Sequence, residues 1–307
     1  MENFSYIGDF KRFLIDSDKS IKTISGYVTD VLFFIDWYVE KSQEAFKPEL
    51  VLPVDIRLYR DFLHETLSLA PSSIKRKLSS LNSFFLWALE ANIVLNNPVK
   101  GIKSISQSVT APKWLSKNEI CKFLRIIDRE LYLSKNKYPV RWLSRHRDCL
   151  IALTFLFTGI RVNEGVALTL NDVQISDRSG YLVIRSGKGK KHRKIPLNKS
   201  ARNAIDSWLS IRPESDLPNL WLSSDNNWQK PLTSRTIQRS IQRLGLEAGI
   251  NLHPHVLRHT YAKQLIDLGI GIEKVAVLLG HSNINTTSIY ITPSLQDLQE
   301  AVDKIEL

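Results

Sequence analysis

Residues 253–262 read HPHVLRHTYA, and the interpretation of the whole chain starts from this stretch. His255 and His259 stand four residues apart and would share one face of a helix, with Arg258 beside them. Three further stretches in the same half of the chain carry cations or a tyrosine: TGIRVNE at 158–164, SGKGKKHR at 186–193, and LGHSNINTTSIY at 279–290.

Each of these stretches alone has an ordinary structural explanation. An ion pair with Glu164 would account for Arg161, and a solvated turn would account for the lysines of residues 186–191. The two histidines would form a pair on a helix surface. Tyr290 would be a half-buried aromatic side chain, as most tyrosines are.

Together, and in this order, the four stretches supply the groups that metal-free phosphoryl transfer needs. Attack on a phosphodiester places negative charge on the nonbridging oxygens, which two arginines can bind and a histidine can donate to. A tyrosine nucleophile, with a pKa of about 10, needs a neighbouring base or cation. A lysine on a hairpin can protonate the leaving 5′-oxygen. No carboxylate cluster suited to two-metal catalysis is evident in the sequence.

The excess positive charge lies in the same half of the chain. Lys and Arg number 42 against 31 Asp and Glu, a formal net charge of +11. Residues 1–110 hold 13 basic and 13 acidic residues, so the whole excess belongs to residues 111–307. This excess favours a polyanionic partner, with nucleic acid ahead of an anionic membrane surface. A solvated surface that keeps the protein soluble is the alternative explanation.

Length and composition are those of a folded, soluble protein. The 307 residues are enough for two domains, and 43% hydrophobic with 24% charged residues exclude a disordered or collagen-like chain. No apolar run approaches the ~20 residues of a membrane span, and the N-terminus lacks the features of a signal peptide. We therefore expect a cytoplasmic, nucleoid-associated protein with no membrane partner.

The sequence predicts no metal site and no cofactor. Cys121 and Cys149 are too few for a disulfide scaffold or a four-thiolate zinc site. His255 and His259 have a spacing that zinc sites use, but the Glu of a His-Glu-x-x-His motif is absent.

Helical periodicity dominates the first hundred residues. It predicts helices at about 22–40 and 55–67, and a third helix that begins near residues 72–73. The small and polar residues 97–112 predict an interdomain linker. Ser116 and Glu119 then form a capping box, which would open the next helix.

The second part of the chain mixes helices with a hairpin. An apolar run at 150–157 would end at the helix-breaking Gly159, and strand-like runs at 181–184 and 194–197 predict a hairpin around residues 187–189. Helical periodicity returns after residue 200 and lasts to the end. We expect a mainly α (α+β) fold, made of an all-helical domain, 1–108, and a helix-rich domain with a small antiparallel sheet, 109–307.

The motifs resemble those of a known family. The strings TGIRVNE, GKGKKHRKIPL, HPHVLRHTYA and LGHSNINTTSIY are similar to the motifs of the tyrosine recombinases, also called the phage integrase family. The resemblance extends over nearly the whole chain, because the helical N-terminal part looks like the core-binding domain of that family. Jointly the motifs are highly specific, although any one of them is not.

The resemblance implies a role for each basic residue that matches a family motif. Arg161 and Arg258 would clamp the phosphate, and Lys188 would be the hairpin acid. Lys190 and Lys191 are close enough to compete with Lys188 for this role. No catalytic position of the family is missing or replaced.

The same resemblance implies the remaining roles. His255 would be the acid/base partner of the tyrosine, His281 a second phosphate donor, and Tyr290 the nucleophile. Glu164 matches a supporting acid that orients the site. His259 matches no catalytic position of the family.

Several basic residues outside these roles are candidate DNA contacts. Lys75, Arg76 and Lys77 fall in the first turn of the helix that begins near 72, where a helix N-terminus favours phosphate. A solvated charge cluster is the alternative explanation. The remaining predicted contacts are Lys190, Lys191 and Arg193.

The resemblance implies a reaction and its partners. Tyr290 would cleave a strand to give a 3′-phosphotyrosyl bond and a free 5′-hydroxyl, and a 5′-hydroxyl from a partner duplex would then attack that bond. The two domains would close as a basic clamp around double-stranded DNA with an inverted-repeat core site, and a homotetramer would join two sites. Accessory proteins are compatible with the sequence.

Within the family, the chain resembles the simple two-domain recombinases of the Xer type and transposon-encoded resolvases. These would resolve or integrate circular or mobile DNA. Two other functions stay open: a DNA-binding regulator that keeps the fold without strand exchange, and a type IB topoisomerase-like enzyme. The complete set of catalytic residues argues against the regulator, and synapsis of two duplexes would distinguish the topoisomerase.

The last residues, 294–307, carry one apolar stripe. Its members fall at helical spacing: Leu295, Leu298, Ala301, Val302 and Ile305. So short a helix is marginal in water and must dock on something. Docking on its own domain is one explanation, and the resemblance implies the other, in which the helix passes to a neighbouring protomer.

Overall fold

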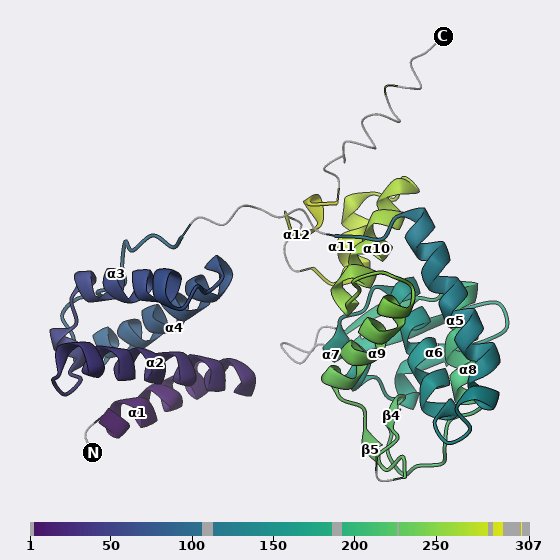
Figure 1. Cartoon of the computed structure of the whole chain (residues 1–307), viewed down its shortest axis with the longest axis horizontal. Helices are drawn as coiled ribbons and strands as arrows, with labels where there is room; N and C mark the ends of the chain where they lie inside the picture. The colour runs from purple at the N-terminus through teal and green to yellow at the C-terminus, as the bar shows by residue number, and fades with distance from the viewer. Residues whose placement is uncertain are drawn as a thin grey trace. The chain divides into compact units, whose positions relative to one another are not determined.

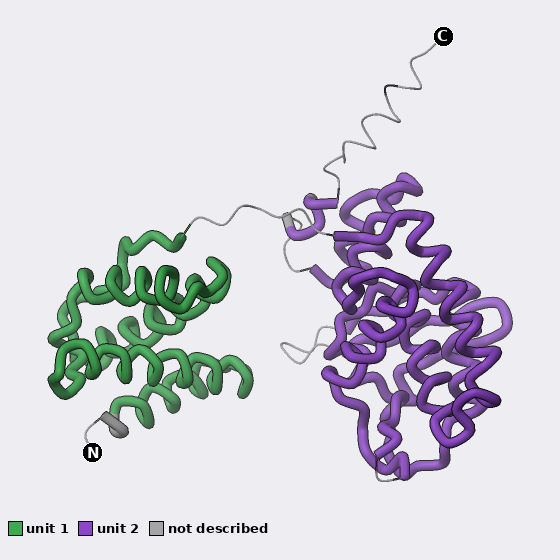
Figure 2. Tube along the Cα trace, in the orientation of Figure 1, with its two compact units in different colours: residues 1–110 green, residues 111–307 purple. Residues whose placement is uncertain are grey.

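The computed structural model describes residues 3–105, 113–185, 192–225, 227–281, 285–290 and 302. The chain divides into two compact units, an N-terminal unit of residues 1–110 and a C-terminal unit of residues 111–307 (Figure 2). The domain boundary predicted at 108 falls outside the described residues, as does most of the apolar stripe predicted at 294–307.

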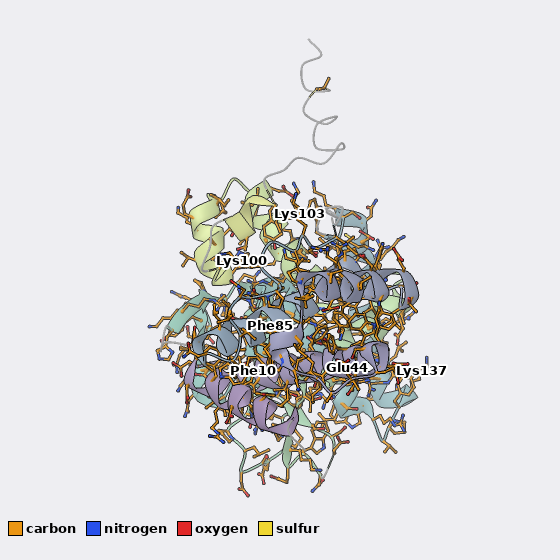
Figure 3. The ribbon with its side chains drawn as sticks, turned by 90° about the vertical axis from the view of Figure 1, so that its left-hand side faces the viewer. Phe10, Glu44, Phe85, Lys100, Lys103 and Lys137 are labelled. Carbon is orange, nitrogen blue, oxygen red and sulfur yellow. The ribbon has the colours of Figure 1, made fainter. Side chains whose placement is uncertain are left out.

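The regular elements of the N-terminal unit are all helices within the described residues (Figure 1). Its elements are α1 (Asn3–Asp16), α2 (Ile21–Ser42), η1 (Pro48–Leu50), α3 (Pro53–Asp61), the π-helical turn η2 (Phe62–Thr66) and α4 (Pro71–Glu90). Phe10 and Phe85 lie in its interior, fully buried (Figure 3). Phe84 meets Phe10 edge-on, with ring centroids 5.3 Å apart, so α1 and α4 share one aromatic core.

A buried carboxylate joins α2 to α4 in this unit. Asp30 on α2 is only 2% exposed, and it accepts hydrogen bonds from Arg76, from Lys77 at 3.1 Å and from the hydroxyl of Ser80 at 2.9 Å. Burying a carboxylate is costly unless it is paired and hydrogen-bonded, and these three partners offset that cost for Asp30 between the helices.

The C-terminal unit surrounds one central helix. Its elements are α5 (Lys117–Lys137), α6 (Trp142–Thr158), α7 (Val162–Ala167), η3 (Leu170–Asp172), β1 (Val173–Ile175), β2 (Gly180–Arg185), β3 (His192–Pro196), α8 (Lys199–Leu209), β4 (Leu222–Ser223), β5 (Lys230–Pro231), α9 (Ser234–Glu247), α10 (Pro254–Asp267), α11 (Ile272–Leu279) and α12 (Asn285–Ser288) (Figure 1). Helices α5, α8, α9 and α10 all pack on α6, whose C-terminal half is almost entirely buried. Strands β1, β2 and β3 form an antiparallel sheet in that order.

Local signals in the sequence placed several elements correctly. The capping box is present, since Ser116 and Glu119 exchange hydrogen bonds at the start of α5. Helix α6 ends at Gly159, which has a φ of 62°. The mainly α fold with a small antiparallel sheet is confirmed.

Three details differ from the prediction. The sheet has a third strand, β1, which is too short for alternation to reveal. Helix α3 begins at Pro53, earlier than expected, because proline is favoured in the first turn of a helix. The prediction of uninterrupted helix after residue 200 is wrong, because Pro213 and Pro218 cannot continue α8 and the chain forms β4 and β5 before α9.

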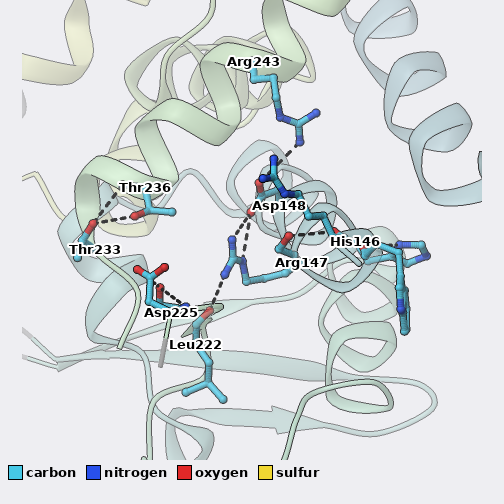
Figure 4. A network of polar contacts seen from close by, with 12 residues as sticks. His146, Arg147, Asp148, Leu222, Asp225, Thr233, Thr236 and Arg243 are labelled. Atoms are coloured by element: carbon cyan, nitrogen blue, oxygen red, sulfur yellow. Dashed lines mark hydrogen bonds and ion pairs between the residues drawn. The ribbon is translucent and has the colours of Figure 1, made fainter. Parts of the chain in front are cut away.

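A network of buried charges connects α6 to β4 and α9. Arg147, only 3% exposed, donates to the backbone oxygen of Leu222 and to the carboxylate of Asp148, both at 2.7 Å (Figure 4). Arg243 on α9 lies 3.6 Å from the other oxygen of Asp148. Asp148 therefore balances two guanidinium groups in the interior.

Among the described residues, we find no helix of the length and apolar character that a bilayer crossing requires.

Asp148→Ala should lower the free energy of unfolding by about 3–5 kcal/mol, because it leaves the buried guanidinium of Arg147 without its counter-charge. The matched control is Asp177→Ala at an exposed aspartate, which should change the free energy by less than about 0.5 kcal/mol. Urea unfolding of the full chain, followed by circular dichroism, measures both. A loss for Asp148→Ala no larger than the control would contradict this account of the network.

Candidate active site

Gly159 brings the two arginines of the predicted clamp together. A Cβ atom at this position would lie 2.5 Å from the ring of Tyr261, and the φ of 62° is one that other residues rarely adopt. The close contact lets α6 end directly against α10, so Arg161, the N-cap of α7, lies next to Arg258 of α10.

Both arginines bind backbone carbonyls at the ends of helices. Arg258, 4% exposed, donates to the oxygens of Gly159 and Leu279, each at 2.7 Å. Arg161 donates to the oxygen of Gly280 at 3.0 Å. Carbonyls orient a guanidinium without neutralising it, so these bonds leave the positive charge of Arg258 uncompensated in a buried place, whereas Arg161 also pairs with Glu164.

Glu164 is the carboxylate that holds this arrangement. It accepts from the side chain of Arg161 at 3.0 Å and from its backbone nitrogen at 2.8 Å. Burial alone would raise the pKa of Glu164, but hydrogen bonds from Arg193 and Arg161 outweigh burial and lower it. Glu164 is therefore ionised at neutral pH, as the supporting role predicted for it requires.

Arg193, at the base of the predicted hairpin on β3, is engaged inside the site. Its two terminal nitrogens bind the two oxygens of Glu164 at 2.9 and 2.8 Å, and its Nε donates to the oxygen of Leu278 at 3.1 Å. A Cβ on Gly280 would lie 2.6 Å from this guanidinium. Arg193 thus links β3, α7 and the end of α11, a role that the sequence analysis missed; its contact with DNA stays a prediction.

Tyr290 is buried, and its hydroxyl lies 2.6 Å from Nδ1 of His259. The phenol ring belongs to an apolar cluster with Ala262, Val275 and Leu279. His259 is the functional candidate that sequence reasoning left out. Its place next to Arg258 was the only available signal.

The two other histidines differ in how they are connected to the tyrosine. His255 is exposed on the first turn of α10, and no hydrogen bond joins it to Tyr290 among the described residues. His281 is fixed by Thr287, whose hydroxyl is 2.7 Å from its Nδ1, and the oxygen of Thr287 accepts from the backbone nitrogen of Tyr290 at 3.1 Å. His281 is therefore connected to the tyrosine through one residue.

The electrostatics of the site favour neutral histidines beside charged arginines. Burial, together with neighbouring cations, lowers the pKa of His255 and lowers those of His259 and His281 to about 4. Burial and Arg161 lower the pKa of Arg258 to about 10, so this group stays charged at neutral pH. With Arg161, Arg193 and Arg258 against Glu164, the site carries excess positive charge and is suited to an anion.

Several predicted residues lie outside this geometry. Lys188, Lys190 and Lys191 fall outside the described residues, although β2 and β3 pair up to Arg185 and His192 on either side of them. In the described ranges, no three His, Cys, Asp or Glu residues are grouped so that they could hold a metal ion.

The basic cluster of the N-terminal unit is only partly free. Arg76 and Lys77 are paired with Asp30, although the Arg76 side chain is 53% exposed. Lys75 is exposed. Their contacts with DNA stay predictions, and Lys75 is the member of the cluster best placed to make one.

A polar face of α9 is a further candidate surface. Its exposed residues fall at helical spacing: Arg235, Gln238, Arg239 and Gln242. The helix begins beside the clamp, because the hydroxyl of Ser234 donates to the side chain of Asn163 on α7 at 2.7 Å. Arg and Gln are residue types that bind guanine and adenine edges through paired hydrogen bonds.

Comparison with known proteins agrees with this geometry. Residues 113–296 match the phage integrase family, and residues 7–92 match the N-terminal SAM-like domain of phage integrases. A tyrosine recombinase of Agathobacter rectalis is 32% identical over 88% of this chain and 85% of its own length. The tyrosine recombinase XerC of Listeria welshimeri is 28% identical over 93% of this chain and 91% of its own.

The fold also agrees with a solved structure. The crystal structure of the XerH site-specific recombinase in a post-cleavage complex with palindromic difH substrate matches with a TM-score of 0.77 and 23% identity, over 97% of this chain and 94% of that one. The resemblance seen in the motifs is therefore confirmed: the chain belongs to the phage integrase family, the tyrosine recombinases.

Proposed function

We propose that this chain is a site-specific DNA recombinase in which Tyr290 attacks a phosphodiester. Members of the tyrosine recombinase family cleave and rejoin DNA strands. The observation that carries the proposal is the guanidinium of Arg258, which is buried near Arg161 and, in the described part of the chain, hydrogen-bonds to two backbone carbonyls and to no carboxylate. A buried cation without a counter-ion is stabilised when an anion such as a DNA phosphate arrives.

The residues divide the chemistry among themselves. Arg161 and Arg258 bind the nonbridging oxygens, whose negative charge grows as the phosphorus takes on a fifth ligand. In the tautomer with Nδ1 bound to Thr287, the Nε2–H of His281 donates to the same oxygens. His255, exposed at the mouth of the site, exchanges protons with the reacting groups.

The reaction conserves the energy of the cleaved bond. The phenol oxygen of Tyr290 bonds to phosphorus as the 5′-oxygen leaves, and Lys188 gives that oxygen its proton. A 5′-hydroxyl from a second duplex then attacks the phosphotyrosyl bond and restores the phenol. No step in this sequence calls for a metal or a nucleotide cofactor.

Double-stranded DNA with an inverted-repeat core site is the proposed partner. The N-terminal unit supplies core-site contacts through the helix that carries Lys75, and the C-terminal unit supplies catalysis and the α9 face. Two copies on one site and four copies on two sites would complete the assembly, with a role in resolving or integrating circular or mobile DNA. The protein would work at the nucleoid.

Tyr290→Phe should abolish the covalent protein–DNA adduct and leave DNA affinity within about threefold, because it removes only the nucleophilic oxygen and keeps the buried ring. Nicked suicide substrates, made from DNA that flanks the gene, trap the adduct for gel analysis. Tyr261→Phe, which changes a neighbouring tyrosine of the same apolar cluster, is the matched control and should keep the adduct. A wild-type yield from Tyr290→Phe would refute the assignment of the nucleophile.

Arg193→Ala should slow cleavage by at least about tenfold with little loss of DNA affinity, because Arg193 orients Glu164 rather than touching the backbone of DNA. Arg193→Lys should be similarly slow, since an ammonium cannot bind both carboxylate oxygens as a fork. Single-turnover cleavage rates and binding isotherms separate the two effects. Weaker binding with a flatter salt dependence and an unchanged cleavage rate would instead make Arg193 a DNA contact.

Lys75→Glu should weaken DNA binding. It should also reduce the slope of log affinity against log salt by about one to two, since each neutralised phosphate contributes about 0.9 to that slope. Lys19→Glu, an equal charge change at an exposed lysine between α1 and α2, is the control and should leave the slope unchanged. Fluorescence anisotropy from about 50 to 300 mM salt gives both slopes. Equal slopes for the two variants would show that Lys75 does not contact DNA and belongs to a solvated surface.

A further inference from the structure

The hydroxyl of Tyr290 has one hydrogen-bond partner in the described part of the chain, the Nδ1 of His259. The distance is 2.6 Å, and the two ring centroids are 5.5 Å apart. His255, the histidine expected to act on the tyrosine, lies one helical turn earlier and is exposed. The nucleophile is thus held by a residue that the catalytic assignment does not use.

The phenol is fixed at both ends. Ala262, Val275 and Leu279 surround its ring, and Ala262 lies three residues after His259 on the same face of α10. The backbone nitrogen of Tyr290 donates to Thr287, which is fully buried. A change at His259 would therefore free the oxygen alone and leave the ring in place.

The chemistry of the neighbours leaves His259 one distinctive task. The guanidinium groups of Arg161 and Arg258 are donors only and cannot accept the phenol hydrogen. A neutral imidazole can accept the phenol hydrogen at one nitrogen. When the hydroxyl donates to the histidine in this way, the lone pairs of the phenol oxygen point away from the histidine. Those lone pairs are the ones that must meet phosphorus.

His259 orients the hydroxyl and does not take its proton before attack. Burial, with help from His255 and Arg258, lowers the pKa of His259 to about 4. Burial raises the pKa of Tyr290, although Arg258 and Arg161 oppose the rise. At neutral pH the proton therefore stays on the phenol, and the imidazole carries no charge.

We propose that His259 is a positioning residue for the nucleophile, which accepts the hydrogen bond of the Tyr290 hydroxyl and sets the direction from which the phenol oxygen attacks. The inference rests on the proposed function, since it assigns a role within that reaction. It adds a residue to the site and separates the task of His259 from that of His255.

The test compares two substitutions at one position. His259→Phe keeps a ring and removes the acceptor, whereas His259→Asn can present a side-chain oxygen close to the position of Nδ1. On a nicked suicide substrate, single-turnover cleavage should slow by about 10- to 100-fold for His259→Phe and by no more than about threefold for His259→Asn. DNA affinity should be unchanged for both, because the imidazole is neutral at pH 7. His253→Phe, at the exposed histidine that immediately precedes this helix, is the control.

Either of two kinetic outcomes overturns the proposal. Cleavage by His259→Phe at the wild-type rate or faster would refute it, because the hydrogen bond would then be dispensable or inhibitory. Equal slowing by Phe and Asn would also refute it, because it would show that the hydrogen-bond acceptor is not what matters. Thermal melting of each variant identifies any loss of folding.

A spectroscopic measurement tests the bond without any cleavage. In the DNA-free, full-length protein labelled with 15N-histidine, the Nδ1 resonance of His259 should move when Tyr290→Phe removes its partner. An unmoved resonance would overturn the inference even if His259→Phe were slow. A wild-type protein that forms no adduct on any substrate, with the resonance moving as expected, would count against the proposed function instead.

Discussion

The hydrogen bonds from Arg258 to the carbonyls of Gly159 and Leu279 join the parts of the active site. One carbonyl ends α6 and the other ends α11, so a single guanidinium on α10 fixes three helices with respect to one another. These bonds require the burial of a cation, and within the described ranges no carboxylate forms an ion pair with it. In return, the cation remains available for a substrate anion.

Glu164 extends this constraint to the sheet. Because its two oxygens bind both Arg161 and Arg193, the first turn of α7 and strand β3 are tied together through one side chain. Lys188, the predicted acid, precedes that strand in the sequence by four residues. The predicted phosphate clamp and the described start of β3 are therefore linked through one carboxylate.

Short-range signals made much of this architecture predictable. The capping box at Ser116 and the glycine at 159 act within one helical turn, so the sequence alone locates those helix ends. The roles given to the cations and the tyrosine stay predictions, made because the reaction needs those chemical types and because their strings resemble a family. The family resemblance and the mainly α fold were confirmed on those grounds.

The missed features share a physical cause, which is dependence on tertiary contacts. Arg193 meets Glu164 across 29 positions of the sequence, and Tyr290 meets His259 across 31, so no local pattern encodes either pair. The pairing of Arg76 and Lys77 with Asp30 likewise depends on how α2 packs on α4. Strands of two or three residues, such as β1 and β4, are too short to show an alternation.

If Tyr290 is the nucleophile, as proposed, its burial bears on the lifetime of the covalent intermediate. A phosphotyrosyl bond is a phosphodiester that water can also attack, and hydrolysis would leave a broken DNA strand rather than a joined one. Since the phenol ring is part of an apolar cluster, the linkage would form with one side already shielded from solvent. The apolar packing that stabilises this part of the fold would then also limit hydrolysis of the proposed intermediate.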